Sequence, residues 1–211
     1  MSDIQDVAQI LDGRWELTID GVRPLQQSYD RLIAIGDLQW TDYEVTVPIT
    51  VNSFDPSSFV GPSKGAAVGV LLRWPGHEDW DGRRPREGWH PHGAAGLLRW
   101  EGDPLNPTTS IQIFGNQQAP YVLTDMPQNI AFVTYIFKMR VSTLMVATPV
   151  GGSPVPNSLY EFKVWQEGQP EPEGWMLSAP EGPDDIQAGS LLLLAHHVDC
   201  VFGNVSIVPL N

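Results

Sequence analysis

Strict alternation between apolar and polar residues is the feature that most constrains the fold of this chain. From Tyr43 to Val51 every second residue is apolar, which is the period-two pattern of a half-buried β-strand. Short segments of the same kind recur along the chain, separated by turn residues. The 20 Gly and 19 Pro residues among 211 disfavour long helices. The pattern predicts an all-β protein, a two-sheet antiparallel β-sandwich that forms a single domain over residues 1–211.

The first segment is the exception, because it has the spacing of a helix. One apolar stripe with a period near 3.6 is formed by Ile4, Val7, Ala8 and Leu11. Ser2 and Gln5 have the spacing of a capping box, and Gly13 follows as a stop signal. We therefore expect a short N-terminal helix, a helical lead-in over residues 1–12.

Charge, cysteine content and the N-terminal sequence limit the classes of binding partner and the cellular locations that we expect for this protein. Twelve Lys and Arg against 25 Asp and Glu give a formal net charge of −13, which disfavours nucleic acid and anionic membranes as partners. We also find no apolar run near the roughly 20 residues of a membrane span. The single cysteine, Cys200, excludes an internal disulfide. Since no signal-peptide pattern opens the chain, we expect a cytoplasmic protein if the chain is complete and an extracellular one if it was excised from a secreted protein.

A short repeat links two of the expected strands. Leu71-Leu72-Arg73-Trp74 recurs as Leu97-Leu98-Arg99-Trp100. The repeat predicts two nearby strands with the same face pattern, possible partners in one sheet. The alternative is a chance match in a leucine-rich chain.

Four segments, in order along the chain, carry a family resemblance. They are Trp40–Val47, Gly69–Trp74, Tyr160–Trp165 with Glu171, Pro172 and Trp175, and Val201–Ile207. They resemble strands of laminin-G-like domains in the concanavalin A-like lectin/glucanase superfamily, and the similarity spans roughly Trp15 to Val208. The resemblance implies a jelly roll of two antiparallel sheets, one of them concave, with Trp165 and Trp175 packed in the core. That superfamily contains lectins, hydrolases, lyases and structural modules, so the fold alone implies no function.

The chain departs from the family pattern in two places. No strand carries the E-x-D-x-x-E run of the laminarinase-type hydrolases, whose carboxylates share one face. Where many relatives place a calcium-binding Asp in the closing strand, this chain has Gly203. We therefore expect no cofactor; the alternative is a structural calcium ion held by Asp199 or Asn204.

The segment from Pro75 to Ala95, between the two repeated strands, holds most of the candidate site residues. The candidates for ligand binding within it are His77, Asp79, Trp80, Asp81, Arg83, Trp89, His90 and His92, and the flanking strands add Arg73, Trp74, Trp100 and Gln112. Flat tryptophan faces stack on sugar rings, and planar polar groups reach the hydroxyls around them. The segment therefore predicts a groove for an oligo- or polysaccharide.

Other interpretations of this segment stay open. It is equally well explained as a structural loop that its tryptophans pin to the surface. His90-Pro91-His92 with a nearby carboxylate suits a metal ion. Asp79, Asp81 and Glu87 offer the carboxylates of a glycosidase.

His196 and His197 lie in an apolar strand pattern near the C-terminus. Alternation sends adjacent side chains to opposite faces, so we expect one buried core histidine and one on the concave face. The leading hypothesis is a carbohydrate-binding, lectin-like module without catalysis. The alternatives are a glycoside hydrolase or lyase acting on a polysaccharide, and a protein-interaction or assembly module.

Overall fold

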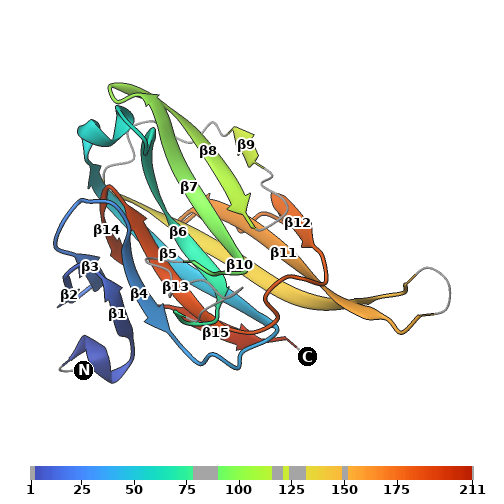
Figure 1. The fold of residues 1–211 in the computed structure, drawn as a ribbon. Coiled ribbons are helices and arrows are strands. Elements are labelled where there is room, and N and C mark those ends of the chain that lie inside the picture. Colours follow the sequence, from blue (N-terminus) through green and yellow to red (C-terminus); the bar gives the residue numbers. More distant parts are fainter. Residues whose placement is uncertain (1–2, 78–89, 116–120, 124–131, 149–151, 211) are drawn as a thin grey trace.

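Two antiparallel sheets packed face to face form the protein (Figure 1). The computed structural model describes residues 3–77, 90–115, 121–123, 132–148 and 152–210. Within these residues the helical elements are two short 3-10 turns, η1 (Ile4–Asp6) and η2 (Pro56–Phe59). No helix in these ranges is long and apolar enough to cross a membrane. The prediction of an all-β, two-sheet sandwich is confirmed.

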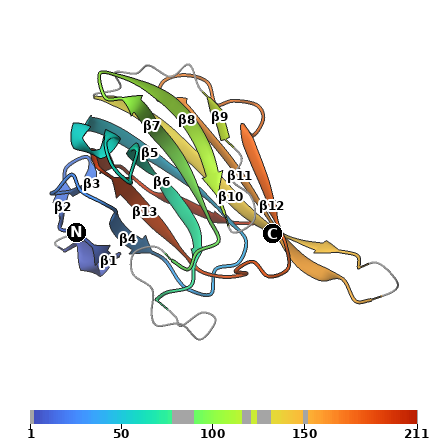
Figure 2. The same ribbon diagram turned by 45° about the horizontal axis from the view of Figure 1, so that its top comes forward.

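The first sheet has seven strands in the order β1-β4-β13-β6-β7-β8-β9. Their bounds are β1 (Gln9–Asp12), β4 (Arg31–Ile35), β13 (Ser190–His196), β6 (Gly65–Trp74), β7 (Ala94–Asp103), β8 (Asn106–Phe114) and β9 (Tyr121–Leu123). A strand from near the C-terminus, β13, therefore lies between two strands from the first half of the chain (Figure 2).

The second sheet has eight strands, seven of them in the order β12-β11-β10-β5-β14-β3-β2. Their bounds are β12 (Leu177–Glu181), β11 (Val155–Gln166), β10 (Val133–Val146), β5 (Tyr43–Phe54), β14 (Val198–Phe202), β3 (Gly21–Pro24) and β2 (Trp15–Thr18), and β15 (Ser206–Pro209) also pairs with β5. The connection from β13 to β14 passes from one sheet to the other, as in a jelly roll.

The core follows the alternation seen in the sequence. In β5 the apolar positions from Tyr43 to Val51 are all buried and the residues between them are partly exposed. The seven-stranded sheet is different, because it is apolar on both faces. Its outer face carries a second buried cluster: Leu32, Ala34, Leu71, Trp74, Ala95, Leu97, Leu192 and Leu194. This explains the continuous apolar run in β13, since a strand buried on both faces does not alternate.

The predicted N-terminal helix is wrong beyond its first turn. Helical structure stops at Asp6, and Gln9–Asp12 forms β1 on β4. Asp3, not Ser2, caps the turn by accepting a hydrogen bond from the backbone N–H of Gln5 (3.0 Å). Pairing with the free edge of β4 satisfies more backbone groups than a single short helix would.

The repeated strands are neighbours, as predicted. β6 and β7 pair antiparallel, with Leu71 opposite Ala95 and Gly69 opposite Leu97. Their face patterns differ, however, and this difference determines which of the two arginines is available at the surface.

Candidate functional site

Five of the twelve predicted ligand-binding residues lie outside the described residues: Asp79, Trp80, Asp81, Arg83 and Trp89. The same holds for Glu87, which belongs to the glycosidase alternative. The glycosidase hypothesis and the tryptophan-stacking hypothesis for this loop therefore remain predictions.

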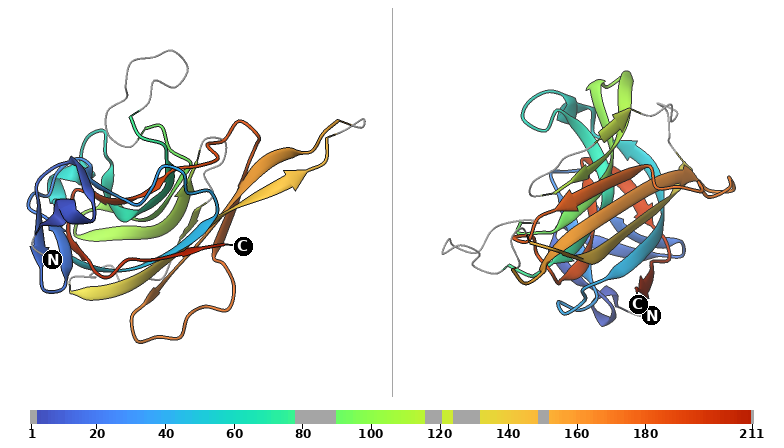
Figure 3. Two further views of the ribbon diagram at one scale, coloured as in Figure 1. Left: turned by 90° about the horizontal axis from the view of Figure 1, so that it is seen from below. Right: turned by 90° about the vertical axis from the view of Figure 1, so that its right-hand side faces the viewer.

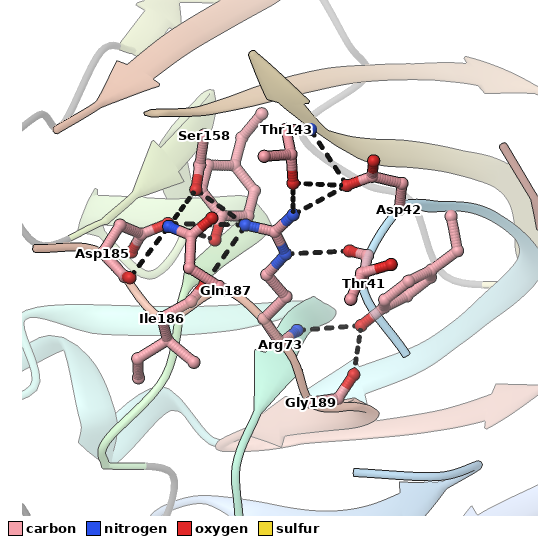
Figure 4. A network of polar contacts seen from close by, with 11 residues as sticks. Thr41, Asp42, Arg73, Thr143, Ser158, Asp185, Ile186, Gln187 and Gly189 are labelled. Atoms are coloured by element: carbon pink, nitrogen blue, oxygen red, sulfur yellow. Dashed lines mark hydrogen bonds and ion pairs between the residues drawn. The ribbon is translucent and has the colours of Figure 1, made fainter. Parts of the chain in front are cut away.

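Arg73, predicted to contact the ligand, is instead a fully buried structural residue (Figure 4). Its guanidinium donates hydrogen bonds to three side chains and two backbone carbonyls: those of Asp42, Thr143 and Ser158, and those of Thr41 and Ile186. The carboxylate of Asp185 lies 4.0 Å away, and it also accepts a hydrogen bond from the Tyr160 hydroxyl (2.8 Å). Burial, followed by the charge of Asp185, raises the pKa of Tyr160. Arg73 thus ties β6 to strands of the opposite sheet and cannot reach a ligand outside.

The backbone explains why this arginine points inward. Arg73 has a φ of +56°, in the left-handed region. That conformation interrupts the alternation of β6, so that Arg73 follows the core residue Leu72 into the interior. The neighbouring strand has a matching irregularity between Ser190 and Leu192.

Of the two flanking tryptophans, Trp100 differs from the prediction. Trp100 is fully buried in the core, where it stacks on Phe54 at 6.0 Å between ring centroids. Trp74 is buried on the outer face and meets the edge of His77 at 5.1 Å. Trp100 is therefore a packing residue, whereas Trp74 and His77 line a shallow pocket beside the N-terminal strand.

His92 is buried as well, and it stacks on Phe114 at an interplanar angle of 9°. Burial, followed by the neighbouring His90, lowers the pKa of His92 to about 3, so the ring stays neutral at physiological pH. The described residues contain no group of three or more His, Cys, Asp or Glu side chains placed to hold a metal ion. Within the part of the chain that the structure describes, His90 and His92 thus have no third metal-ligating side chain placed beside them.

The alternative calcium ligand Asp199 is already engaged by a cation. Arg23 donates two hydrogen bonds of 2.7 Å to its two carboxylate oxygens, and Asn52 donates a third at 3.2 Å. A guanidinium at this distance occupies the place that a cation would need, so the donor set does not fit calcium at Asp199. Asn204 is exposed.

Trp165 and Trp175 are not core residues, contrary to the prediction. Both are partly exposed on the outer face of the eight-stranded sheet. Lys163 lies over both rings, at 5.9 and 5.0 Å from the centroids, and Arg140 lies 4.7 Å from the Trp175 ring. Cation–π contacts thus replace the expected core packing.

A pocket of about 240 Å³ lies at one end of the outer face of the seven-stranded sheet. It is lined by strand residues and by residues of the connections between strands: Ala67, Leu97, Arg99, Phe114, Leu194 and His196, and Tyr29, Asp30, Pro62 and Ser63. Ala67 pairs with His196 on one side and with Arg99 on the other. Because paired residues share a face, a small alanine separates an imidazole from a guanidinium about 10 Å away, which leaves the hollow between them.

One side of the pocket is a hydrogen-bonded Asp–His pair. The Oδ1 atom of Asp30 lies 2.7 Å from Nδ1 of His196. The backbone of Asp30 has a positive φ (+34°). His197 has a φ of +57°, so its ring meets that of His196 at 4.6 Å instead of pointing to the opposite face. His196 lies on the outer face of the seven-stranded sheet, where it lines the pocket; that one histidine lies on the concave face stays a prediction. The predicted core histidine is wrong, because His197 is half-buried and lies 3.1 Å from the Ser63 hydroxyl.

The other features of the pocket are an open aromatic ring and a planar cation. Tyr29 is 61% exposed, and its ring meets the edge of His196 at 4.9 Å. The charge of Asp30 raises the pKa of Tyr29, which keeps the hydroxyl protonated as a donor. Arg99 pairs with Glu101 (3.2 Å) and donates to Gln112 (3.4 Å), which is one of the predicted site residues.

Sequence reasoning missed most of this pocket, since Tyr29, Asp30 and Arg99 were not among the predicted site residues. The available signal was the repeat itself, which marked Arg99 as the partner of Arg73 in an identical context. Tyr29 and Asp30 precede a short strand with no distinctive spacing, and only strand pairing brings them beside His196.

Solved structures of other proteins share the fold of this chain, although no similarity in sequence was found. No protein-family model matches the chain, and no curated protein matches it in sequence. Among solved structures, the carbohydrate-binding module CBM66 from Bacillus subtilis is 16% identical with a TM-score of 0.50, covering 95% of this chain and 94% of that one. A legume lectin-like domain from Entamoeba histolytica is 9% identical, with a TM-score of 0.55 and coverages of 98% and 92%. The exoplasmic/lumenal domain of VIP36, bound to Ca²⁺ and Man3GlcNAc, is 12% identical, with a TM-score of 0.55 and coverages of 100% and 86%. The fold is therefore a lectin-like β-sandwich of the concanavalin A type.

Proposed function

We propose that this protein is a carbohydrate-binding, lectin-like module without catalysis of its own, and that its ligand site is the pocket between Tyr29, Arg99 and His196. The observation that carries the proposal is the exposed Tyr29 ring beside a hollow walled by a guanidinium and an Asp–His pair. An open ring stacks on the C–H face of a sugar, while planar donors and acceptors bind its hydroxyls. The four sequence segments that resemble laminin-G-like domains suggest that relationship within the wider superfamily.

The similar structures support the same class of ligand. They include a carbohydrate-binding module, a legume lectin-like domain and a domain bound to Man3GlcNAc. The pocket of about 240 Å³ is close to the lower limit for small-molecule sites. It suits one sugar residue of an oligo- or polysaccharide.

The carboxylates in the pocket favour binding over hydrolysis. A glycosidase needs two carboxyl groups on either side of the scissile bond, about 5–10 Å apart. Asp30 is the one carboxylate among the described residues that line the pocket, and His196 already binds it. A module that only binds would leave its glycan intact.

Native affinity electrophoresis through gels that contain different polysaccharides tests the proposal. The wild-type chain should be retarded by one or a few glycans, and Tyr29→Ala should abolish the retardation without changing the melting temperature. Phe132→Ala is the matched control, because Phe132 is 80% exposed and lies just before β10, on the other sheet.

Three outcomes separate the hypotheses. Loss of retardation in Trp80→Ala or Trp89→Ala, but not in Tyr29→Ala, would move the site to the segment 75–95. Release of new reducing ends, lost on changing Asp79, Asp81 or Glu87, would establish the hydrolase. No retardation by any glycan would refute the proposed function and favour an assembly module.

A further inference from the structure

The β10–β11 hairpin extends well beyond the body of the sandwich (Figure 3). β10 pairs with β5 only as far as Val141, and β11 pairs with β12 only from Ser158. Beyond these points the two strands pair with each other, as far as Val146 opposite Val155. We call residues 142–148 and 152–157 the hairpin arm.

The arm exposes apolar side chains on both of its faces. Leu144, Met145 and Val146 are 44%, 64% and 42% exposed. Since successive side chains alternate, Met145 lies on one face of the ribbon and its two neighbours lie on the other. Elsewhere in the described ranges, exposed large apolar residues never occur three in succession. Such a run is unfavourable in water unless another surface covers it.

Charge distinguishes the arm from the body of the same two strands. Residues 141–160 contain no Asp, Glu, Lys, Arg or His. The adjoining part of the hairpin is covered by ion pairs, such as Arg140 with Glu161 (2.6 Å) and Lys138 with Glu44 (3.1 Å). Because each chain has a net charge of −13, two copies repel each other, and a neutral projection is where they meet at the lowest electrostatic cost.

The two edges of the arm are not equivalent. On the β11 side, Pro154, just before the strand, and Pro156 within it lack a backbone N–H, which prevents regular pairing with a further strand. On β10, Leu144–Val146 contains no proline and has lost the β5 neighbour, so its edge is open to strand addition. A second copy presents an identical open edge, and two such edges pair antiparallel about a two-fold axis.

We propose that the hairpin arm is a self-association surface, and that a second copy of this chain pairs with it along the β10 edge. In that dimer Leu144–Val146 of each copy would be covered by the same residues of the other. The proposal is independent of carbohydrate binding, since it uses no residue of the pocket.

Sedimentation velocity of the full chain over a wide concentration range tests this proposal. The wild-type chain should dimerise, and higher salt should strengthen association by screening the net charge. Met145→Glu should raise the dimer dissociation constant about 30-fold or more, the effect of losing one interface hot spot. Leu105→Glu is the matched control, because Leu105 is 93% exposed in the turn between β7 and β8 and the charge change is the same.

Cross-linking gives a second test that does not depend on a destabilising charge. The native Cys200 is fully buried, so a cysteine added on the arm would be the reactive one. Met145→Cys should form a covalent dimer on mild oxidation, and Leu105→Cys should not. Two results would overturn the proposal: a chain that stays monomeric at every concentration, or a Met145→Glu variant that associates like the wild type. Either result would mean that the arm is not covered by a second copy of this chain.

Discussion

The two copies of the sequence Leu-Leu-Arg-Trp are paired strands of one sheet, yet they place the same residue in opposite environments. In the first repeat (Leu71–Trp74) Arg73 is fully buried between the sheets. In the second repeat (Leu97–Trp100) Arg99 lies on the outer face and lines the pocket. One arginine holds the sandwich together and the other is available to a ligand, although their local sequences are identical.

The tryptophans of the two repeats also lie in opposite environments. Trp74 belongs to the apolar cluster on the outer face, whereas Trp100 belongs to the core. The left-handed conformation of Arg73 shifts the alternation of the first repeat by one position. Side-chain type therefore does not decide the role of these residues; one backbone dihedral angle does.

The largest effect should come from Arg73→Met. Removing the guanidinium leaves the buried carboxylate of Asp185 without the cation beside it and takes one hydrogen-bond donor from the Ser158 hydroxyl, which costs about 3–5 kcal/mol of the free energy of unfolding. Arg99→Met should cost less than about 1 kcal/mol, since its ion pair with Glu101 is partly exposed. Urea denaturation of both variants measures the difference. Equal losses would refute the distinction between the two repeats.

A pH effect should come from His92, which lies just before the second repeat's strand. The backbone N–H of the next residue, Gly93, donates to the carbonyl of Arg73 (3.1 Å), so this segment links the two repeats. Burial lowers the pKa of His92 to about 3, well below the 6.5 of an unfolded histidine. The unfolded chain therefore binds the proton first, and stability falls as pH falls below about 6.5, by up to about 1.4 kcal/mol per pH unit.

His92→Phe should remove this acid sensitivity, because phenylalanine keeps the stacking on Phe114 without a titrating group. The free energy of unfolding, measured between pH 7 and pH 5, should fall less in the variant than in the wild type. A parallel decline in both proteins would show that other groups carry the acid sensitivity.

A smaller energetic effect, but a specific one, should follow from Arg99→Met in glycan binding. Loss of one charged hydrogen-bond donor in the pocket should weaken affinity about tenfold or more, equivalent to about 1.4 kcal/mol. Affinity electrophoresis or calorimetry with the glycan found for the wild type measures it. Unchanged affinity would show that Arg99 does not bind the glycan. The two arginines of the repeat would then differ in burial but not in a binding role.

The smallest effect should be that of Glu171→Gln on the outer face of the other sheet. Hydrogen bonds from Lys163, followed by those from Lys138, lower the pKa of Glu171, so this pair network contributes stability that is lost as pH falls through the acidic range. The side chain of Glu171 is 43% exposed, however, and surface pairs contribute about 0–1 kcal/mol. Thermal unfolding at neutral pH should show almost no change. A loss as large as that of Arg73→Met would mean that exposed and buried ion pairs are equivalent here.

Much of the fold was predictable because it depends on local pattern. The alternation from Tyr43 to Val51 assigned each side chain of β5 to the correct face. The helix expected over residues 1–12 failed because the free edge of β4, far along the chain, offered backbone partners that local spacing does not reveal. Trp165 and Trp175 were misplaced for a similar reason, since Lys163 and Arg140 hold them outside the core.

The sequence by itself determined the all-β sandwich, the pairing of the two repeats and the separation of apolar from polar faces, because period-two alternation acts within each strand. The tertiary structure decided which arginine is buried and which residues form the pocket. Tyr29, Arg99 and His196 are distant in the chain, and they meet only because β13 inserts between β4 and β6. Pairing between non-consecutive strands and a single left-handed residue are non-local choices, which a local pattern does not encode.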